Sequence, residues 1–105
     1  MTQMIFTPSD VNLPRAQSEL QTLSGLGRTP SGGVSRFTFS ESHQKATFQV
    51  ADWMAETGLH VTFDRWGNLF GRAPGNERGE AVLTGSHLDS VPNGGHYDGP
   101  LGVIS

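Results

Sequence analysis

The sequence predicts an α/β fold in which two helices precede a β-hairpin, a buried strand, a loop and the start of one more element. Helical periodicity of apolar residues in the first half, and short β-prone runs between turn residues in the second half, predict this order. With 105 residues, 34% of them hydrophobic, and 14 glycines, the chain can bury only a small core. We therefore expect residues 1–105 to be an incomplete N-terminal portion of a larger α/β domain.

A first helix is predicted after a loose arm of residues 1–11. The apolar residues that share one helical face are Leu13, Ala16, Leu20 and Leu23. Pro14 is tolerated in the first helical turn, and Gly25 can end the helix. The glycines and prolines of residues 24–36 then predict a loop.

A second helix is predicted after Ser40, whose hydroxyl can cap the first turn. Its apolar face consists of Ala46, Val50, Trp53 and Met54. Gly58 is well placed to end this helix, because glycine readily takes the left-handed conformation found just after a helix. This helix has the clearest sequence signal in the chain.

The next predicted element is a β-hairpin. Residues 60–64 and 69–72 are β-prone runs, and residues 65–68 between them contain a Gly-Asn pair typical of turns. We expect Asn68 to serve this turn. The apolar run 81–85 is typical of a buried strand, and residues 101–104 open a further helix or strand.

Composition narrows the classes of function. The net charge is −3 and the basic residues are scattered, so we expect neither nucleic acid nor a membrane surface as a partner. The absence of cysteine excludes disulfides and zinc–thiolate sites. No apolar run approaches the roughly 20 residues that span a bilayer, and the N-terminus lacks the pattern of a secretory signal. A cytoplasmic protein is expected.

The loop after residues 81–85 carries the most informative chemistry. His87 and Asp89 come just past the predicted strand, where α/β proteins usually bind ligands. A neutral histidine and an ionised aspartate are ordinary metal ligands, and Asp98 follows after a turn-forming stretch that can bring a second carboxylate back. A His-x-Asp triplet in a glycine-rich loop is also typical of a simple hydrogen-bonded turn. The triplet by itself favours the turn over the metal site.

Other polar residues have weaker claims to a function. Arg36 follows a Gly-Gly turn and could bind a carboxylate substrate or form a structural salt bridge. We place His43 on the helix surface, His60 on the hairpin and His96 in a solvent-facing part of the loop. Two tryptophans are expected to pack rather than to bind substrate: Trp53 and Trp66.

Residues 85–103, Gly-Ser-His-Leu-Asp-Ser-Val-Pro-Asn-Gly-Gly-His-Tyr-Asp-Gly-Pro-Leu-Gly-Val, resemble the first metal-binding motif of a known family. This is the N-carbamoyl-L-amino-acid hydrolase and allantoate amidohydrolase family of the dinuclear-metal, aminopeptidase-like superfamily. The resemblance continues upstream through residues 32–36, 46–58 and 64–72, and it covers roughly residues 13–105. In this family position 96 is often lysine, whereas this chain has His96.

The resemblance implies an aminopeptidase-like (phosphorylase/hydrolase-like) catalytic domain with two divalent metal ions, Zn²⁺ or Mn²⁺. His87 resembles the terminal ligand of one metal, Asp98 the carboxylate that bridges both, and Asp89 the residue that orients His87. The other ligands, the general base and the dimerisation and substrate domain lie further downstream in the family and are absent from these 105 residues. The implied reaction of the whole enzyme, expected to be a homodimer, is hydrolysis of a small N-carbamoyl amino acid or ureido acid.

Two alternatives remain. The chain could be a truncated, non-catalytic remnant, or part of an aminopeptidase or acylase of the same superfamily. The segments 93–95 and 32–34 favour the carbamoylase branch over the aminopeptidases. On its own the 105-residue chain is expected to be inactive, because water activation needs both a metal and a positioned base.

Overall fold

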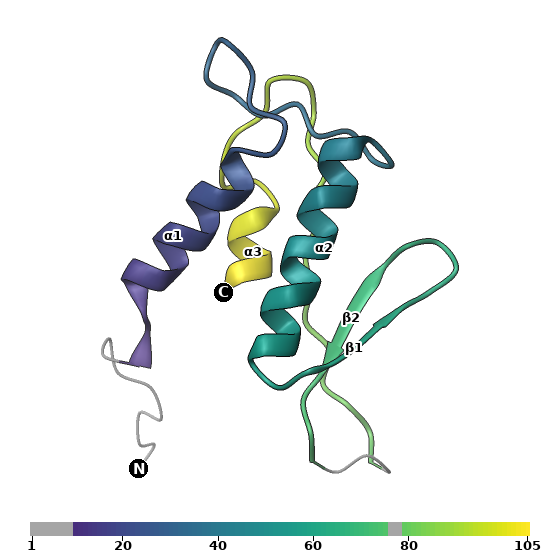
Figure 1. The fold of residues 1–105 in the computed structure, drawn as a ribbon. Coiled ribbons are helices and arrows are strands. Elements are labelled where there is room, and N and C mark those ends of the chain that lie inside the picture. Colours follow the sequence, from purple (N-terminus) through teal and green to yellow (C-terminus); the bar gives the residue numbers. More distant parts are fainter. Residues whose placement is uncertain (1–9, 76–78) are drawn as a thin grey trace.

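A computed structural model describes residues 10–75 and 79–105 of the chain. Its elements are α1 (Leu13–Ser24), α2 (Glu41–Glu56), β1 (His60–Phe63), β2 (Leu69–Arg72) and α3 (Pro100–Ile104). The short helix α3 packs against α1, and both strands pack against α2 (Figure 1). Most of the predicted N-terminal arm lies outside the described residues.

Both predicted helices are confirmed. In α1 the Asn12 side chain caps the first turn by accepting a hydrogen bond from the Arg15 N–H at 3.1 Å, and Gly25 follows the last turn. In α2 the predicted cap, Ser40, accepts from the His43 N–H at 3.2 Å. Gly58 takes a φ of 89° just after α2, a conformation that costs glycine little.

The core lies where these elements meet. Leu23 of α1 and Ala46 and Val50 of α2 form its fully buried centre. Seven partly buried apolar residues pack around this centre: Leu26, Trp53, Met54, Leu69, Leu88, Val103 and Ile104. The core therefore draws on all three helices, the hairpin and the loop that carries the predicted metal ligands, as expected for burial of apolar surface.

The hairpin is also confirmed. β1 and β2 pair antiparallel, in the register His60↔Arg72 through Phe63↔Leu69. The Asp64 carboxylate accepts from the backbone N–H groups of Trp66 and Asn68 and from the Asn68 side chain at 2.8 Å. These bonds, that from Asn68 above all, hold the pKa of Asp64 below its usual value. Asn68 thus serves the turn, as predicted.

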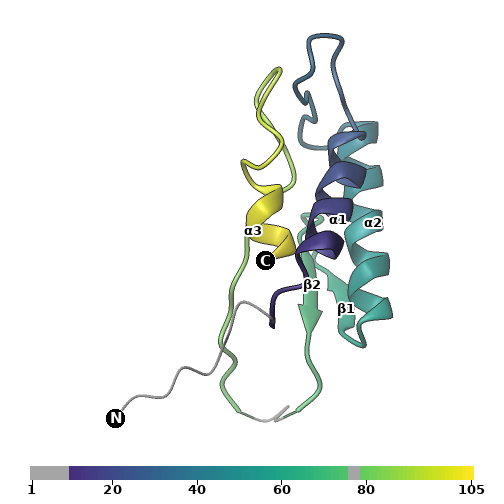
Figure 2. The same cartoon turned by 90° about the vertical axis from the view of Figure 1, so that its left-hand side faces the viewer.

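Two expectations are wrong. Residues 81–85 form no strand, and Val82 and Leu83 are exposed, since the β1–β2 sheet offers them no paired neighbour in the described part of the chain. A strand needs backbone partners, which an apolar run cannot supply by itself. Figure 2 shows this stretch running extended along one side of the molecule toward α3. Trp66 does not pack either, because at the tip of the hairpin turn its side chain is 73% exposed.

The remaining outcomes are mixed. Trp53 packs on the core as expected, and residues after the loop form a helix, α3, with Pro100 in its first turn. Within residues 10–75 and 79–105, no helix has the length and apolar character needed to cross a bilayer. The cytoplasmic location stays a prediction.

Candidate metal-binding site

Two loops pair backbone to backbone at one end of the helices. Residues 27–36 and 88–96, here called the paired loops, meet where Val34 and Gly94 exchange two hydrogen bonds of 2.9 and 2.7 Å. Further along, the Ser90 N–H donates to the Arg36 carbonyl and the Arg36 N–H to the Ser90 hydroxyl, both at 2.8 Å. Figure 1 shows the two loops side by side at the upper end of α1 and α2. Segments more than 50 residues apart therefore form one unit.

The contact between the loops is close enough to require glycine. Asn93, with a φ of 49°, accepts hydrogen bonds from Thr29 at 2.6 Å and Ser31 at 2.9 Å through its side-chain oxygen. A Cβ on Gly33 would overlap the Asn93 side chain. Glycine at position 33 therefore permits this approach.

His96 belongs to the same junction. Its Nε2 lies 2.6 Å from the Gly32 carbonyl oxygen and must carry the proton of that hydrogen bond, since a carbonyl only accepts. The expected solvent-facing position is wrong, because the pairing of the two loops leaves the ring only partly exposed. The hydrogen bond from His96 to Gly32 therefore joins the two loops.

Arg36 anchors the paired loops to α1. Its side chain is 1% exposed, and its Nε donates to the Leu88 carbonyl at 2.6 Å. Its Nη1 donates to the carbonyls of Leu23 and Leu26 at 2.7 and 2.8 Å. Burial lowers the pKa of Arg36, and the negative charge of Asp89 partly offsets this. In the described residues the guanidinium bonds to backbone carbonyls and does not form the expected structural salt bridge; the alternative, binding of a carboxylate substrate, stays a prediction.

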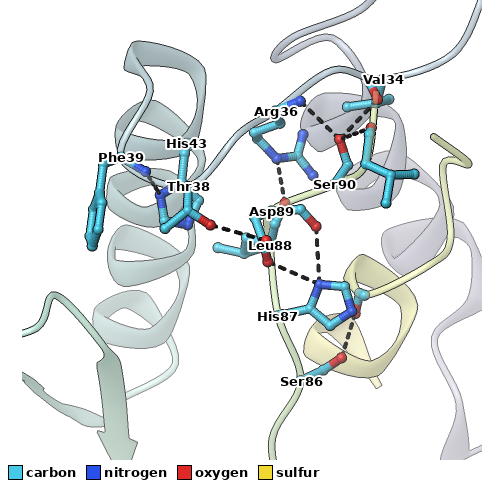
Figure 3. A network of polar contacts seen from close by, with 12 residues as sticks. Val34, Arg36, Thr38, Phe39, His43, Ser86, His87, Leu88, Asp89 and Ser90 are labelled. Atoms are coloured by element: carbon cyan, nitrogen blue, oxygen red, sulfur yellow. Dashed lines mark hydrogen bonds and ion pairs between the residues drawn. The ribbon is translucent and has the colours of Figure 1, made fainter. Parts of the chain in front are cut away.

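His87 and Asp89 lie together, as their spacing predicts. The His87 Nδ1 is 3.2 Å from the Asp89 Oδ1 and 3.0 Å from the Asp89 carbonyl oxygen (Figure 3). With two acceptor oxygens facing it, Nδ1 is the nitrogen that carries the hydrogen, and the lone pair of that tautomer lies on Nε2. Both side chains are about half exposed. The hydrogen bond of Nδ1 is to the Asp89 carbonyl, and the carboxylate is a second, longer contact; either kind of oxygen at Nδ1 fixes the tautomer of a histidine that binds a metal.

Asp98 directly precedes Gly99, and the backbone of Gly99 lies against His87. A Cβ on Gly99 would lie 2.5 Å from the His87 carbonyl oxygen and 2.7 Å from the ring carbon Cε1, and the φ of Gly99 is 98°. The Ser86 hydroxyl donates to the Gly99 carbonyl at 2.9 Å. The backbone at residues 98–99 thus runs against His87, with the exposed Asp98 next to it in sequence.

The predicted metal ligands do not form a complete site in the described residues. Across the residues that the structure describes, no three histidine, aspartate or glutamate side chains form a group that could hold a metal ion. His60 is exposed on β1, as expected. His43 of α2 is partly buried, and its Nδ1 accepts from the Phe39 N–H at 3.1 Å. Burial lowers the pKa of His43; Asp89 raises it less strongly, and Arg36 lowers it further.

Sequence reasoning missed one polar neighbour of the site. The Thr38 hydroxyl donates to the Asp89 Oδ2 at 3.0 Å (Figure 3). Thr38 stands two residues after Arg36 in a stretch with no motif of its own, and only the folded chain brings it to Asp89.

Comparison with known proteins agrees with the resemblance. The chain is 49% identical over 92 residues to an N-carbamoyl-L-amino acid amidohydrolase of Geobacillus stearothermophilus, covering 87% of this chain and 22% of that protein. It is 41% identical over 90 residues to an allantoate amidohydrolase of Escherichia coli, covering 85% and 22%. A hydantoinase/carbamoylase family amidase from Burkholderia ambifaria superimposes with a TM-score of 0.82 at 37% identity, covering 87% of this chain and 22% of that one. No protein-family model matches the chain.

The chain is therefore a homologue of carbamoyl-amino-acid and allantoate amidohydrolases, and its fold matches hydantoinase/carbamoylase amidases. The predicted relationship to an enzyme family is confirmed. The chain spans about a fifth of the length of these relatives.

Proposed function

We propose that this chain carries the first metal-binding motif of a metal-dependent hydrolase that acts on C–N bonds other than peptide bonds. The whole enzyme would cleave the carbamoyl or ureido group of an N-carbamoyl-L-amino acid or of allantoate. One observation carries the proposal: the Nδ1 of His87 faces the Asp89 carboxylate, and the ring lies against Gly99, next to Asp98. The names of the homologous amidohydrolases support the reaction class.

The residues present fit a divalent metal. The space that a Cβ on Gly99 would fill is occupied by His87, so the glycine lets the imidazole lie beside residue 98. Imidazole and carboxylate together suit both Zn²⁺ and Mn²⁺. When bound, a pair of such ions supplies Lewis-acid activation of water and of the scissile carbonyl group.

The chain's own residues have separate tasks in this proposal. His87 would bind one ion through Nε2, while Asp89 keeps the proton on Nδ1 and fixes the ring plane. Asp98 would bridge the two ions, since one carboxylate shared by two dications offsets their mutual repulsion. For a carbamoyl substrate the net reaction consumes one water and yields the free amino acid, carbon dioxide and ammonia.

Within the described residues no third ligand joins His87 and Asp98, so the proposed site needs further ligands from elsewhere. We infer that further ligands, a general base and a substrate-binding and dimerisation domain belong to the remainder of an aminopeptidase-like homodimeric enzyme. The runner-up, a non-catalytic remnant, would retain the local geometry of His87 and Asp89 without binding metal tightly.

The test uses the full-length protein that contains this chain. After dialysis, metal analysis is expected to find about two Zn²⁺ or Mn²⁺ ions per chain, and far fewer in the His87→Ala and Asp98→Asn variants. His60→Ala removes an exposed histidine on β1 and serves as the matched control. Ammonia release would then be compared for N-carbamoyl amino acids, allantoate and dipeptides. Activity on dipeptides alone, or a metal content unaffected by both site variants, would refute the proposal.

A further inference from the structure

The segment of residues 36–38 lies along residues 88–90, which directly follow the predicted metal ligand His87 in the chain (Figure 3). Arg36 holds residues 88–90 through two hydrogen bonds. Its side-chain Nε donates to the Leu88 carbonyl, and its backbone N–H donates to the Ser90 hydroxyl. The position of the backbone on either side of Asp89 is therefore fixed by a buried residue. The Asp89 carboxylate can still rotate on this fixed backbone, so its orientation needs a further contact.

We propose that Thr38 is a positioning residue that fixes this orientation, an inference that rests on the proposed function. The two oxygens of Asp89 have different partners: Oδ1 lies 3.2 Å from the His87 Nδ1, and Oδ2 accepts from the Thr38 hydroxyl at 3.0 Å. A carboxylate held at one oxygen can still rotate about its Cβ–Cγ bond, whereas one held at both has a defined plane. Thr38 thereby sets the direction in which Asp89 presents its oxygen to the imidazole.

The order of contacts runs from Thr38 to Asp89 to His87, and it ends at the nitrogen opposite the one that would bind the metal. The charge of Asp89 also reaches two groups of other segments, since it partly offsets the lowering by burial of the pKa of the Arg36 guanidinium and of His43 in α2. In the described part of the chain, the hydrogen bonds of Arg36 and His43 go to other groups, so the Thr38 hydroxyl is the donor that defines the geometry of the Asp89 carboxylate at Oδ2.

Thr38 is suited to a clean test because it is exposed. Thr38→Val keeps the shape of the side chain and removes the donor, and Thr38→Ser keeps the donor and removes a methyl group. Thr62→Val makes the same chemical change at an exposed position of β1 and controls for it. Each variant would be made in the full-length protein, stripped of metal and titrated with Zn²⁺ against a chelator of known affinity.

We expect Thr38→Val to weaken Zn²⁺ binding about tenfold, as is typical when a hydrogen bond behind a metal ligand is lost. Thr38→Ser and Thr62→Val should bind within about twofold of the unmodified protein, and the Tm of all four metal-free proteins should agree. Unchanged Zn²⁺ affinity in Thr38→Val would overturn the inference, and so would an equal loss in Thr38→Ser, because serine keeps the hydroxyl.

Asp89→Asn separates this inference from the proposal on which it rests. If Asp89→Asn weakens Zn²⁺ binding and Thr38→Val does not, the metal site stands and the role of Thr38 is refuted. If neither Asp89→Asn nor His87→Ala changes Zn²⁺ binding, the metal site itself is refuted.

Discussion

The paired loops and the stretch of residues 81–85 both lack helix and strand, yet they are organised in opposite ways. In the paired loops, backbone groups and small polar side chains are matched across the junction, from Thr29 and Asn93 at one end to Arg36 and Leu88 at the other. In residues 81–85 the side chains of Ala81, Val82 and Leu83 are apolar and exposed, and the described residues offer this stretch no hydrogen-bonded backbone neighbour. Irregular backbone becomes well defined where its polar groups find partners within the chain.

This difference bears on the site. His87 lies between the two regions in the sequence. Residues 81–85 precede it, and the paired loop that begins with Leu88, whose carbonyl accepts from Arg36, follows it. The ligand segment is therefore anchored mainly from its C-terminal side, through Leu88, Asp89 and Ser90. Variants that remove these anchors should act on the site, whereas variants in residues 81–85 should not.

The largest effect is expected from Arg36→Met. This change removes three hydrogen bonds to the Leu23, Leu26 and Leu88 carbonyls from a side chain that is 1% exposed. Leaving these acceptors without their charged donor should lower the free energy of unfolding by about 3–5 kcal/mol. Urea unfolding of the full-length protein measures the change. Arg28→Met, an exposed arginine of the same loop, should alter stability by less than about 0.5 kcal/mol.

A smaller but more local effect is expected from Gly99→Ala. Gly99 and Gly58 both have a positive φ, 98° and 89°, so alanine should strain the backbone at either position. Only at Gly99 would the new Cβ also overlap the His87 carbonyl and ring, while at Gly58 it meets open space. We expect Gly99→Ala to destabilise by about 2–3 kcal/mol and to weaken Zn²⁺ binding, and Gly58→Ala to leave Zn²⁺ affinity unchanged. Equal Zn²⁺ affinities in the two variants would contradict the placement of His87 against Gly99.

What could be predicted from the sequence depends on how local each signal is. The helices and the hairpin rest on neighbours within a few residues, such as Ser40 with the His43 N–H or Asp64 with Asn68, and these predictions are confirmed. The His87–Asp89 contact is equally local, because a spacing of two suffices to place both side chains together.

The failures share the opposite property. Whether residues 81–85 and Trp66 are buried depends on which segments lie beside them in space. The local sequence pattern does not contain this information. The Arg36 and Thr38 contacts to residues 88 and 89 span about 50 positions of sequence, and a single sequence carries no signal for such a pairing. The complete ligand set of the proposed two-metal site could not be predicted either, since the described part of the chain contains no complete ligand group.

The stretch of residues 81–85 gives a third prediction, which is that a substitution there has almost no effect. Leu83→Ala in the 105-residue chain should change the free energy of unfolding by less than about 0.5 kcal/mol, because the side chain is 80% exposed. Leu23→Ala makes the same chemical change in a fully buried position and should cost about 2–5 kcal/mol. A cost above about 1 kcal/mol for Leu83→Ala would show that this side chain is covered and would remove the contrast between the two regions.

The smallest effect concerns pH and His43, at the end of α2 that faces the paired loops (Figure 3). The pKa of His43 lies below its ordinary value of about 6.5, mainly because of burial. The unfolded chain therefore binds a proton more readily than the folded chain, so the stabilisation is present above the ordinary pKa and is lost as pH falls through the lowered one. Protonation of Nδ1 would also remove the acceptor for the Phe39 N–H.

We expect the urea midpoint of the unmodified protein to fall between pH 7 and pH 5, and this fall to be smaller in His43→Gln, where the position cannot be protonated. His60→Gln changes an exposed histidine on β1 and should keep the full pH dependence. The nearby charges of Asp89 and Arg36 act on His43 in opposite directions, so Asp89→Asn should steepen the fall by removing the charge that favours the imidazolium. An identical pH profile for His43→Gln and His60→Gln would assign the pH dependence to other groups and leave His43 as a purely structural acceptor at the edge of the paired loops.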